Sequence, residues 1–529
     1  MDRISELPND VLRKILYFLS QKEATRTSVL SKQWRYIWCT RPNLDFTYTP
    51  PSREDGYYYR VRGRNRENKK KFLTIVDNTL QRYHDQDVCV EEFHLSTSLG
   101  NLDYESVPFL EKWSPVLKNT GTKKFHLSIL SEHCPGRVEL PPVVFGSESL
   151  QLLHVERFLL DEKSIERLVP LKHLKSLTLQ RVSIKDEVIL RKIISNCPSI
   201  EILDVHGILS FKRLKVVNDL RSLKKLKFYF DLLGRKSDEE LCSIEIHHPS
   251  LETINISNGN ILLNNGAHFF SLKDLKLAGV ESSLCHLSSC EFPSLENLEF
   301  FYCDGLKGIR VFIDAPNMVY FEYSGNFVPS ISIATFSKEW ESCICISCTP
   351  SNEVPLFFVQ LKEMLELLSQ SKIYLDVDRL PYSNNYIIPE NNIHINGRDG
   401  DKYVVVENLN ILFLSYSFPS SLNGFLSICR PRYVGEFPYY DNEGDSWAME
   451  VTERLWKILT EEKEAREDNK NLDQFKNNEL WWFRDLEEVK LEVCHSNRDE
   501  WHATTLSELP NCDRSEFDRT RFALKWRET

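Results

Sequence analysis

Three nearly identical octamers recur in the middle of this chain. They read PSIEILDV at 198–205, PSLETINI at 249–256 and PSLENLEF at 293–300, and each has the form apolar-x-x-apolar-x-apolar after Pro-Ser. Looser copies extend the series to eight, with first apolar positions 21 to 28 residues apart. One such match arises easily by chance, whereas eight in sequence do not. The first positions are Leu150, Leu174, Ile200, Leu223, Leu251, Leu272, Leu295 and Met318.

This period and pattern are typical of a leucine-rich repeat, which combines a short strand with a longer return segment. The second and third apolar residues of each octamer are expected to point inward and to stack on those of the neighbouring repeats. One repeat cannot bury its apolar face, so the array is the cooperative unit. A proline before the octamer ends the preceding helix and costs only a hydrogen-bond donor at a strand start. Return segments such as EVILRKIISNC at 187–197 are expected to be partly helical.

Further copies are predicted on both sides of this series. Earlier ones are expected at Val90 and Thr122, and later ones at Leu409 and Leu486. Between 340 and 485 the spacing breaks down, although LFFVQLKEMLELLSQSKIYLDV still reads as a helix followed by a strand. The last thirty residues read as a capping segment, which an open repeat array needs at its end.

The first 46 residues are predicted to be helical. In LPNDVLRKILYFL, from Leu7 to Leu19, apolar residues recur at helical spacing and form one stripe. Pro8 precedes this helix, and the side chain of Asn9 or Asp10 is expected to cap it. A unit of about forty residues rarely buries enough apolar surface to be stable alone, so the stripe needs a cover.

The same N-terminal segment resembles a known family. The matching features are Leu7-Pro8, the apolar stripe, TSVLSKQWR at 27–35, Trp38, and PNLDF at 42–46. Together they resemble the F-box of plant F-box/leucine-rich-repeat proteins, many of which end in a further FBD domain. The resemblance implies that the F-box docks on a Skp-type adaptor of a cullin-RING ubiquitin ligase while the repeats hold a protein substrate. It therefore implies a substrate adaptor without catalysis of its own.

In that interpretation an apolar groove of the adaptor covers the stripe. An alternative stays open, in which the same residues form the core of the three-helix unit or pack on the first repeat. Ile37 and Trp38 are candidates for facing inward. The predicted adaptor-binding residues are Leu7, Pro8, Val11, Leu12, Ile15, Leu16, Leu19, Val29, Leu30 and Trp34.

The concave face of the array is the expected substrate surface, because strand alternation places the side chains between the inward residues there. Along the repeats from 176 to 324 these side chains include three Lys, two Asp and two Glu. A polyanion would need more Arg and Lys, so a protein partner is favoured over nucleic acid. Tyr229, Phe301 and Tyr320 are the candidate substrate-binding residues, and the alternative is that they are ordinary solvated strand residues.

Several other signals are weaker. CICISC at 343–348 alternates Cys with Ile and reads as a buried strand rather than a zinc site. His247-His248 reads as a loop or strand edge, and RVRGRNRENKKK at 60–71 as a basic linker or a nuclear import signal. No phosphate-binding glycine loop, nucleophile elbow or H-E-x-x-H pair occurs, so an enzyme, a metal site and a cofactor are not expected.

Composition adds limits on location and partners. The net charge of -11 argues against a role of the whole chain on nucleic acid or an anionic membrane. The N-terminus has no apolar run of signal-peptide type, and no stretch of 18 apolar residues occurs, so we expect no membrane span. The 14 cysteines are then expected as reduced thiols inside the cell, in the nucleus, the cytoplasm or both.

The predicted fold is α/β, with a three-helix F-box followed by a leucine-rich-repeat solenoid whose parallel strands line the concave face. The predicted division is an F-box at 1–46, a basic linker and first helix at 47–88, repeats at 89–340, and irregular repeats with a cap at 341–529. The first helix is predicted to start at Lys71. An FBD-like region is one interpretation of residues 341–529. The predicted function is a substrate-recognition subunit of a ubiquitin ligase. A repeat scaffold or sensor outside any ligase remains the alternative.

Overall fold

The computed structural model covers the chain in two compact units, Met1–Leu263 and Asn264–Thr529, which are described separately. The structure describes residues 7–19, 21–48, 58–98, 107–119, 121–130, 138–184, 186–209, 212–216, 220–232, 241–246, 248–264, 266–347, 354–379, 403–411, 418–438, 452–460, 481–495, 500–509 and 517–527.

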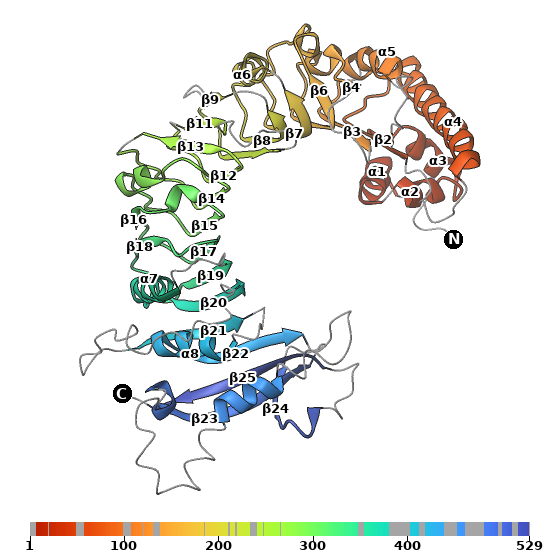
Figure 1. Ribbon diagram of the computed structural model, residues 1–529. Coiled ribbons are helices and arrows are strands. Elements are labelled where there is room, and N and C mark those ends of the chain that lie inside the picture. Colours follow the sequence, from red (N-terminus) through yellow and green to blue (C-terminus); the bar gives the residue numbers. More distant parts are fainter. Residues whose placement is uncertain are drawn as a thin grey trace, which may run out of the picture. The chain divides into compact units, whose positions relative to one another are not determined.

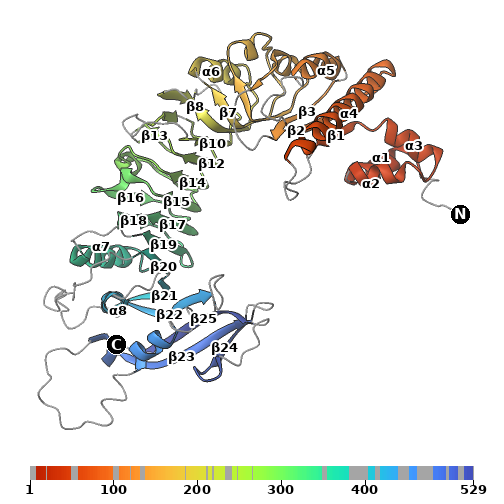
Figure 2. The ribbon, with the colours of Figure 1, turned by 45° about the vertical axis from the view of Figure 1, so that its right-hand side comes forward.

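Three short helices open the first unit, as predicted (Figure 2). The predicted side-chain cap is wrong, because Pro8 occupies the cap position without a side-chain hydrogen bond and Asn9 is already the first helical residue. The helical prediction is also wrong at its end. Residues 43 to 46 alternate between exposed and buried side chains and belong to a strand. The elements are α1 (Asn9–Phe18), α2 (Gln21–Thr27), α3 (Lys32–Cys39) and β1 (Asn43–Tyr48).

A long helix, α4 (Tyr58–Asp85), follows and includes the segment predicted as a basic linker. The predicted start at Lys71 is therefore wrong. Arg, Lys and Glu are good helix formers, so a polar segment without proline need not be a loop. The Glu67 carboxylate pairs with the Lys71 ammonium at 2.9 Å, one turn apart, which supports the helix.

Parallel strands in register form the main sheet of the first unit (Figure 1). The predicted inward residues are buried, as Leu203 and Val205 illustrate, and β1 rather than the segment at Val90 provides the first strand. The copies predicted at Val90 and Thr122 are confirmed as strands. In spatial order the strands are β1, β2 (Glu92–Ser98), β3 (Lys124–Leu130), β5 (Leu152–Glu156), β7 (Ser176–Ile184), β8 (Ile202–Leu209), β10 (Lys225–Phe230) and β12 (Thr253–Ser257).

The return segments of this unit are helices, short 3-10 helices and short strands. The predicted helix near 187 is α6 (Glu187–Ser195), whose N-terminus is capped by the Asp186 side chain accepting from the Val188 N–H at 2.8 Å. Figure 1 shows α4, α5 and α6 on the outer side of the strand row. The remaining elements are α5 (Val107–Asn119), β4 (Val138–Glu139), η2 (Pro142–Gly146), β6 (Phe158–Leu160), η3 (Lys163–Ile165), and the three-stranded sheet of β9 (Arg213–Val216), β11 (Ser243–Ile246) and β13 (Asn260–Leu263).

The second unit continues the same repeat pattern. Its parallel strands are β14 (Asp274–Ala278), β15 (Asn297–Phe301), β17 (Tyr320–Gly325), β19 (Glu341–Ser347), β20 (Lys372–Arg379), β21 (Val404–Ile411) and β22 (Cys429–Pro438). The predicted helix before β20 is α7 (Val354–Leu367). The other return elements are η4 (Cys285–Ser289), η5 (Asp304–Leu306), β16 (Arg310–Asp314), β18 (Ser330–Ala334) and α8 (Phe418–Ile428).

An antiparallel sheet ends the second unit. β22 pairs with β25 (Phe517–Trp526), β25 with β23 (Leu486–His495), and β23 with β24 (Glu500–Thr504). The repeat predicted at Leu486 is therefore wrong, because its strand runs antiparallel to both neighbours. The copy predicted at Leu409 exists but is out of phase, since Leu409 lies beside Leu375 and takes the third apolar position rather than the first. Helix 452–460 and η7 (Trp481–Arg484) complete the described part of this region.

Candidate functional site

The three N-terminal helices enclose a small apolar core of their own. Leu12 and Leu16 of α1 pack with Trp34 and Ile37 of α3, and all four side chains are buried. The Ser31 side chain caps α3 by accepting from the Trp34 N–H at 3.2 Å. The apolar stripes of α1 and α3 face each other, so their residues form the interior of the three-helix unit.

This core corrects the predicted docking face. Leu12, Leu16 and Trp34 are 0%, 3% and 2% exposed, so they cannot contact a partner while the unit is folded. For these three residues the alternative interpretation, a three-helix core, is right. Leu7, Ile15 and Leu19 are partly buried at the edge of that core, together with Trp38.

The remaining predicted residues are exposed. Pro8 and Val11 lie on the surface at the start of α1, and Val29 and Leu30 lie in the turn between α2 and α3, 84% and 60% exposed. Phe18, 83% exposed, joins them from the end of α1 and was not among the predicted contacts. Helical spacing was the signal, because Phe18 follows the buried Leu16 by two residues and therefore lies on the opposite side of α1. We call Val11, Phe18, Val29 and Leu30 the exposed apolar set.

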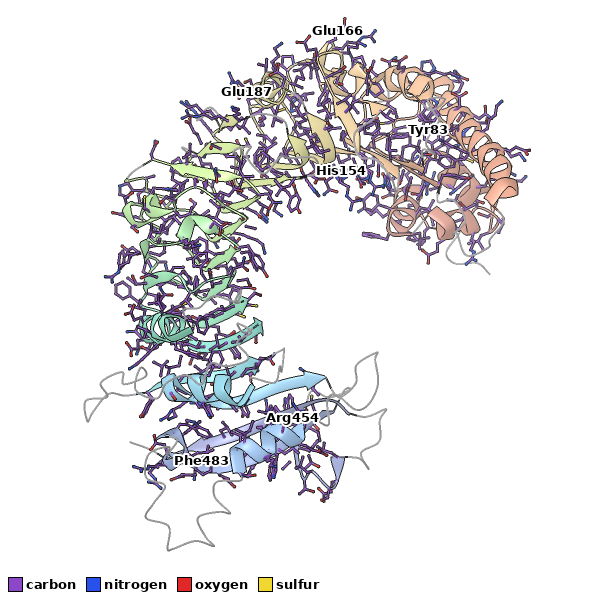
Figure 3. All side chains as sticks on the ribbon, in the orientation of Figure 1. Tyr83, His154, Glu166, Glu187, Arg454 and Phe483 are labelled. Carbon is purple, nitrogen blue, oxygen red and sulfur yellow. The ribbon has the colours of Figure 1, made fainter. Side chains whose placement is uncertain are left out.

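Polar contacts join the three N-terminal helices and the segment after them to α4 and β2. The Tyr83 hydroxyl of α4 donates to the Arg41 carbonyl at 3.0 Å, and the Arg82 guanidinium donates to the Cys39 carbonyl at 3.4 Å. Figure 3 labels Tyr83. Burial raises the pKa of its hydroxyl to about 12, so this phenol keeps its proton. On the other side, the Tyr17 hydroxyl of α1 donates to Glu92 of β2 at 3.3 Å.

The second candidate surface is the exposed face of the strands, opposite the helices. In the first unit, the predicted anchor Tyr229 is 44% exposed and meets His206 of the neighbouring strand edge-on, with ring centroids 4.3 Å apart. Burial lowers the pKa of His206, which favours its neutral form at neutral pH. Tyr229 is therefore partly accessible on this surface, beside His206.

In the second unit the other two predicted anchors already have intramolecular partners. The Lys276 ammonium lies over the Phe301 ring at 4.4 Å and also pairs with Glu299. The Tyr320 hydroxyl donates to Glu322 at 3.0 Å, and burial together with this contact raises its pKa.

Within the second unit, Phe301 and Tyr320 do not lie side by side. Tyr320 lies beside Asn297 at the start of β15, whereas Phe301 is at the end of that strand. Tyr229 belongs to the other unit.

The CICISC segment forms β19, and the prediction of a buried strand holds only in part. Ile344 and Ile346 are buried, but Cys343 and Cys345 are half-exposed on the opposite face. Burial raises the pKa of Cys343 to about 11, with Asp376 and Glu322 adding to the effect, so the thiol stays protonated. Within the described ranges, no group of three His, Cys, Asp or Glu side chains is placed to hold a metal ion. Cys348 and His247 lie outside those ranges, and His248 is buried.

Sequence reasoning missed one cluster on the strand face of the first unit. His94, His126 and His154 come from β2, β3 and β5 and lie directly beside one another in the strand register. Their ring centroids are 4.2 and 3.9 Å apart, and the second pair is stacked. The signal was present in the repeats VEEFHL, TKKFHL and SLQLLHV, each with His between two inward residues. We call these three residues the histidine row.

Comparison with known proteins identifies the two kinds of domain. The F-box domain family matches residues 4–46. A second family, described as "FBD-associated F-box protein At5g56370, LRR repeats", matches residues 110–265. The predicted resemblance to plant F-box/leucine-rich-repeat proteins and the predicted fold class are confirmed. The exact division at 1–46, 47–88, 89–340 and 341–529 stays a prediction.

Individual relatives agree with these matches. The chain is similar to the putative F-box/LRR-repeat protein At5g41840 of Arabidopsis thaliana, 24% identical over 386 residues, which cover 72% of this chain and 60% of that protein. The putative F-box protein At3g44060 is 30% identical over 38% of this chain and 43% of its own length, and the F-box/FBD/LRR-repeat protein At5g56420 is 28% identical over 49% and 55%. Both are from Arabidopsis thaliana. The matched region thus spans less than two thirds of each relative.

The helices in the described part of the chain include none that is both long and apolar enough to cross a membrane.

Proposed function

Because the chain carries an F-box domain ahead of leucine-rich repeats, we propose that it is a non-catalytic substrate-recognition subunit of a ubiquitin ligase. In this role the F-box binds a Skp-type adaptor, which joins a cullin-RING core, and the repeat array binds a protein substrate. The observation that carries the proposal is the folded three-helix unit that keeps large apolar side chains on its surface. Soluble proteins seldom expose such a set unless a partner covers it.

The exposed apolar set would supply the adaptor contact. Fully burying a Val, Leu or Phe side chain contributes about 1.5–3 kcal/mol, so Phe18, Val29 and Leu30 together can account for most of a specific interaction. Leu12, Leu16 and Trp34 support this surface from beneath by fixing α1 and α3. In this proposal the buried stripe stabilises the three helices, and the exposed apolar set contacts the adaptor. The sequence analysis predicted instead that the stripe itself makes the contact.

The strand face of the repeats would bind the substrate. Its charges are of both signs, and some are paired within the protein, as in Lys276–Glu299 and Lys124–Glu92. A nucleic acid would need an excess of cations there, so a protein substrate is the better match. We propose a site of action inside the cell, in the nucleus, the cytoplasm or both.

A binding experiment with surface variants tests the proposal. We expect the full-length chain to co-purify with a Skp-type adaptor, and Val29→Asp combined with Leu30→Asp to weaken the complex at least about a hundredfold, because two apolar contacts are lost and two carboxylates must be desolvated. Both residues are exposed, so the variant should melt like the wild type.

Ile75→Asp is the matched control, since Ile75 is 58% exposed on α4 and outside the exposed apolar set. It should bind the adaptor normally. Failure of the wild-type chain to bind at micromolar adaptor, or equal binding by the double variant and the wild type, would contradict the proposal.

A further inference from the structure

The F-box of this chain is strongly cationic, although the chain as a whole is acidic. Residues 7–41 contain seven Lys and Arg and only two Asp and Glu, whereas the whole chain contains 66 and 77. Most cations of this domain therefore have no acid of the same domain to pair with. The three-helix core does not account for this excess, because its side chains are apolar.

Five of these cations lie on the surface of the three helices. They are Arg13 and Lys14 of α1, Arg26 of α2, and Lys32 and Arg35 of α3, and all five residues are exposed. Within the part of the chain that the structure describes, none of the five pairs with a carboxylate. Their charge therefore faces the solvent or a partner.

Exposed cations of the first repeats differ in this respect. Lys123 pairs with Glu91 at 2.8 Å, and Lys175 pairs with Glu201 at 3.1 Å. Such exposed pairs contribute little to stability, but they show that acids lie opposite cations along the repeats. The excess of cations is thus a property of the F-box surface and not of the whole first unit.

Three of the five cations border the exposed apolar set. Lys14 follows Val11 by three residues and precedes Phe18 by four, which is the spacing of neighbours on a helix surface. Arg26 lies in the last turn of α2 and Lys32 in the first turn of α3. They therefore flank the turn that carries the other two members of the exposed apolar set. We call Lys14, Arg26 and Lys32 the cationic rim.

We propose that the adaptor surface which covers the exposed apolar set has an acidic edge, and that this charge steers the F-box onto it. This inference rests on the proposed function and deepens it, because it names the chemistry of the partner surface. Protein interfaces commonly combine an apolar centre with a polar, hydrated edge. Because the edge on this chain is cationic, carboxylates are its complement, whereas a basic surface would place like charges against each other.

Charges at the edge of an interface act mainly on the rate of association. They stay hydrated in the complex and add little to its lifetime, while their long-range attraction increases the rate of productive encounters. Salt weakens this attraction, because the Debye length falls from about 10 Å at 0.1 M to about 3 Å at 1 M salt. The cationic rim should therefore control the association rate, and the exposed apolar set the dissociation rate.

Stopped-flow mixing of the full-length chain with a Skp-type adaptor measures both rates. At about 0.1 M salt, we expect Lys14→Glu combined with Lys32→Glu to slow association about tenfold and to change dissociation less than about threefold. At about 1 M salt the association rates of variant and wild type should converge. Lys14→Arg combined with Lys32→Arg keeps the charge and should associate like the wild type. Both positions are exposed, and thermal melting verifies that each variant is folded.

Lys163→Glu combined with Lys172→Glu is the matched control. It changes the net charge by the same amount at two exposed positions of the first unit that lie outside the F-box. It should associate at nearly the wild-type rate. The inference is overturned if association does not depend on salt, if the rim variant associates like the wild type, or if the control variant slows association equally.

A labelled DNA duplex distinguishes a polyanion from an acidic protein surface. If the wild type binds the duplex, the rim variant does not, and adaptor association is the same for both, the rim belongs to a nucleic-acid site and the inference is overturned. If the rim variant associates normally while Val29→Asp with Leu30→Asp weakens the complex, only the acidic edge is refuted and the adaptor role stands. Failure of the wild-type chain to bind the adaptor would refute both.

Discussion

Leu298→Asp is expected to unfold the repeats of the second unit. Leu298 is the second residue of β15, is 0% exposed, and lies between Leu275 and Phe321 of the neighbouring strands. Removing such a side chain costs about 2–5 kcal/mol through lost contacts and the cavity left behind. The carboxylate adds a further cost of several kcal/mol because it would be buried among apolar side chains such as Leu275 and Phe321.

The total is comparable to the stability of a typical domain, so the variant should lose cooperative unfolding rather than melt slightly earlier. Each repeat depends on its neighbours, and the damage should spread beyond β15. Circular dichroism with limited proteolysis measures this loss. Val319→Asp is the control, because Val319 is half-exposed just before β17 and should change the melting only slightly. A folded Leu298→Asp protein with unchanged melting would contradict the repeat assignment.

Arg430→Ala is expected to release the C-terminal antiparallel sheet from the last parallel strands. The Arg430 side chain is 6% exposed, and its guanidinium pairs with Asp485 at 2.8 Å. The same group lies over the Tyr403 and Trp526 rings, 3.6 and 4.7 Å from their centroids. It therefore joins β22 to the end of β25 and to the turn before β23.

Removing one partner of a buried ion pair typically costs about 3–5 kcal/mol, and we expect about 3 kcal/mol here because Asp485 retains some contact with water. Arg430→Lys should also destabilise the sheet, since an ammonium lacks the flat surface that stacks on both rings. Urea unfolding of the full chain gives the free energies. Arg432→Ala is the matched control: its side chain is 62% exposed, it pairs with Glu407 at 3.4 Å, and its loss should cost less than about 1 kcal/mol. Equal costs for Arg430→Ala and Arg432→Ala would show that the buried pair does not hold this sheet.

The repeat array could be predicted from the sequence because every repeat has the same pattern of apolar residues. The second and third apolar residues of an octamer, such as Ile254 and Ile256, are buried by any parallel stacking of neighbouring copies. The rule fails where the geometry changes. Leu486 fits the spacing, but its strand pairs antiparallel, and the spacing carries no information about strand direction.

Two errors have a different physical origin. The segment at 60–71 was predicted as a linker because it is charged, yet charged residues with good helix propensity extend α4 back to Tyr58. The F-box stripe was predicted as a docking face, yet helical spacing identifies only which residues share a face. It does not say whether that face meets α3 of the same chain or another protein, and for Leu12 and Leu16 it meets α3.

The histidine row was hidden for a third reason. Each histidine alone is an ordinary half-exposed strand residue, and the cluster exists only because three strands align in register. Such cross-strand clusters become visible in a sequence only when the repeats are aligned and equal positions are compared. The same comparison would not have found Arg430, whose partners come from three separate segments.

The central claim is that the chain connects a substrate to a ubiquitin ligase through its F-box surface. Reconstituted ubiquitin transfer tests it most directly, with the full chain, a Skp-type adaptor, the cullin-RING core and a charged E2. The account predicts that lysines of the chain itself become ubiquitylated, and that Val29→Asp with Leu30→Asp abolishes the signal while Ile75→Asp does not. A chain that binds the adaptor but receives no ubiquitin, or one modified equally in the double variant, would contradict the account and favour a repeat scaffold that acts outside the ligase.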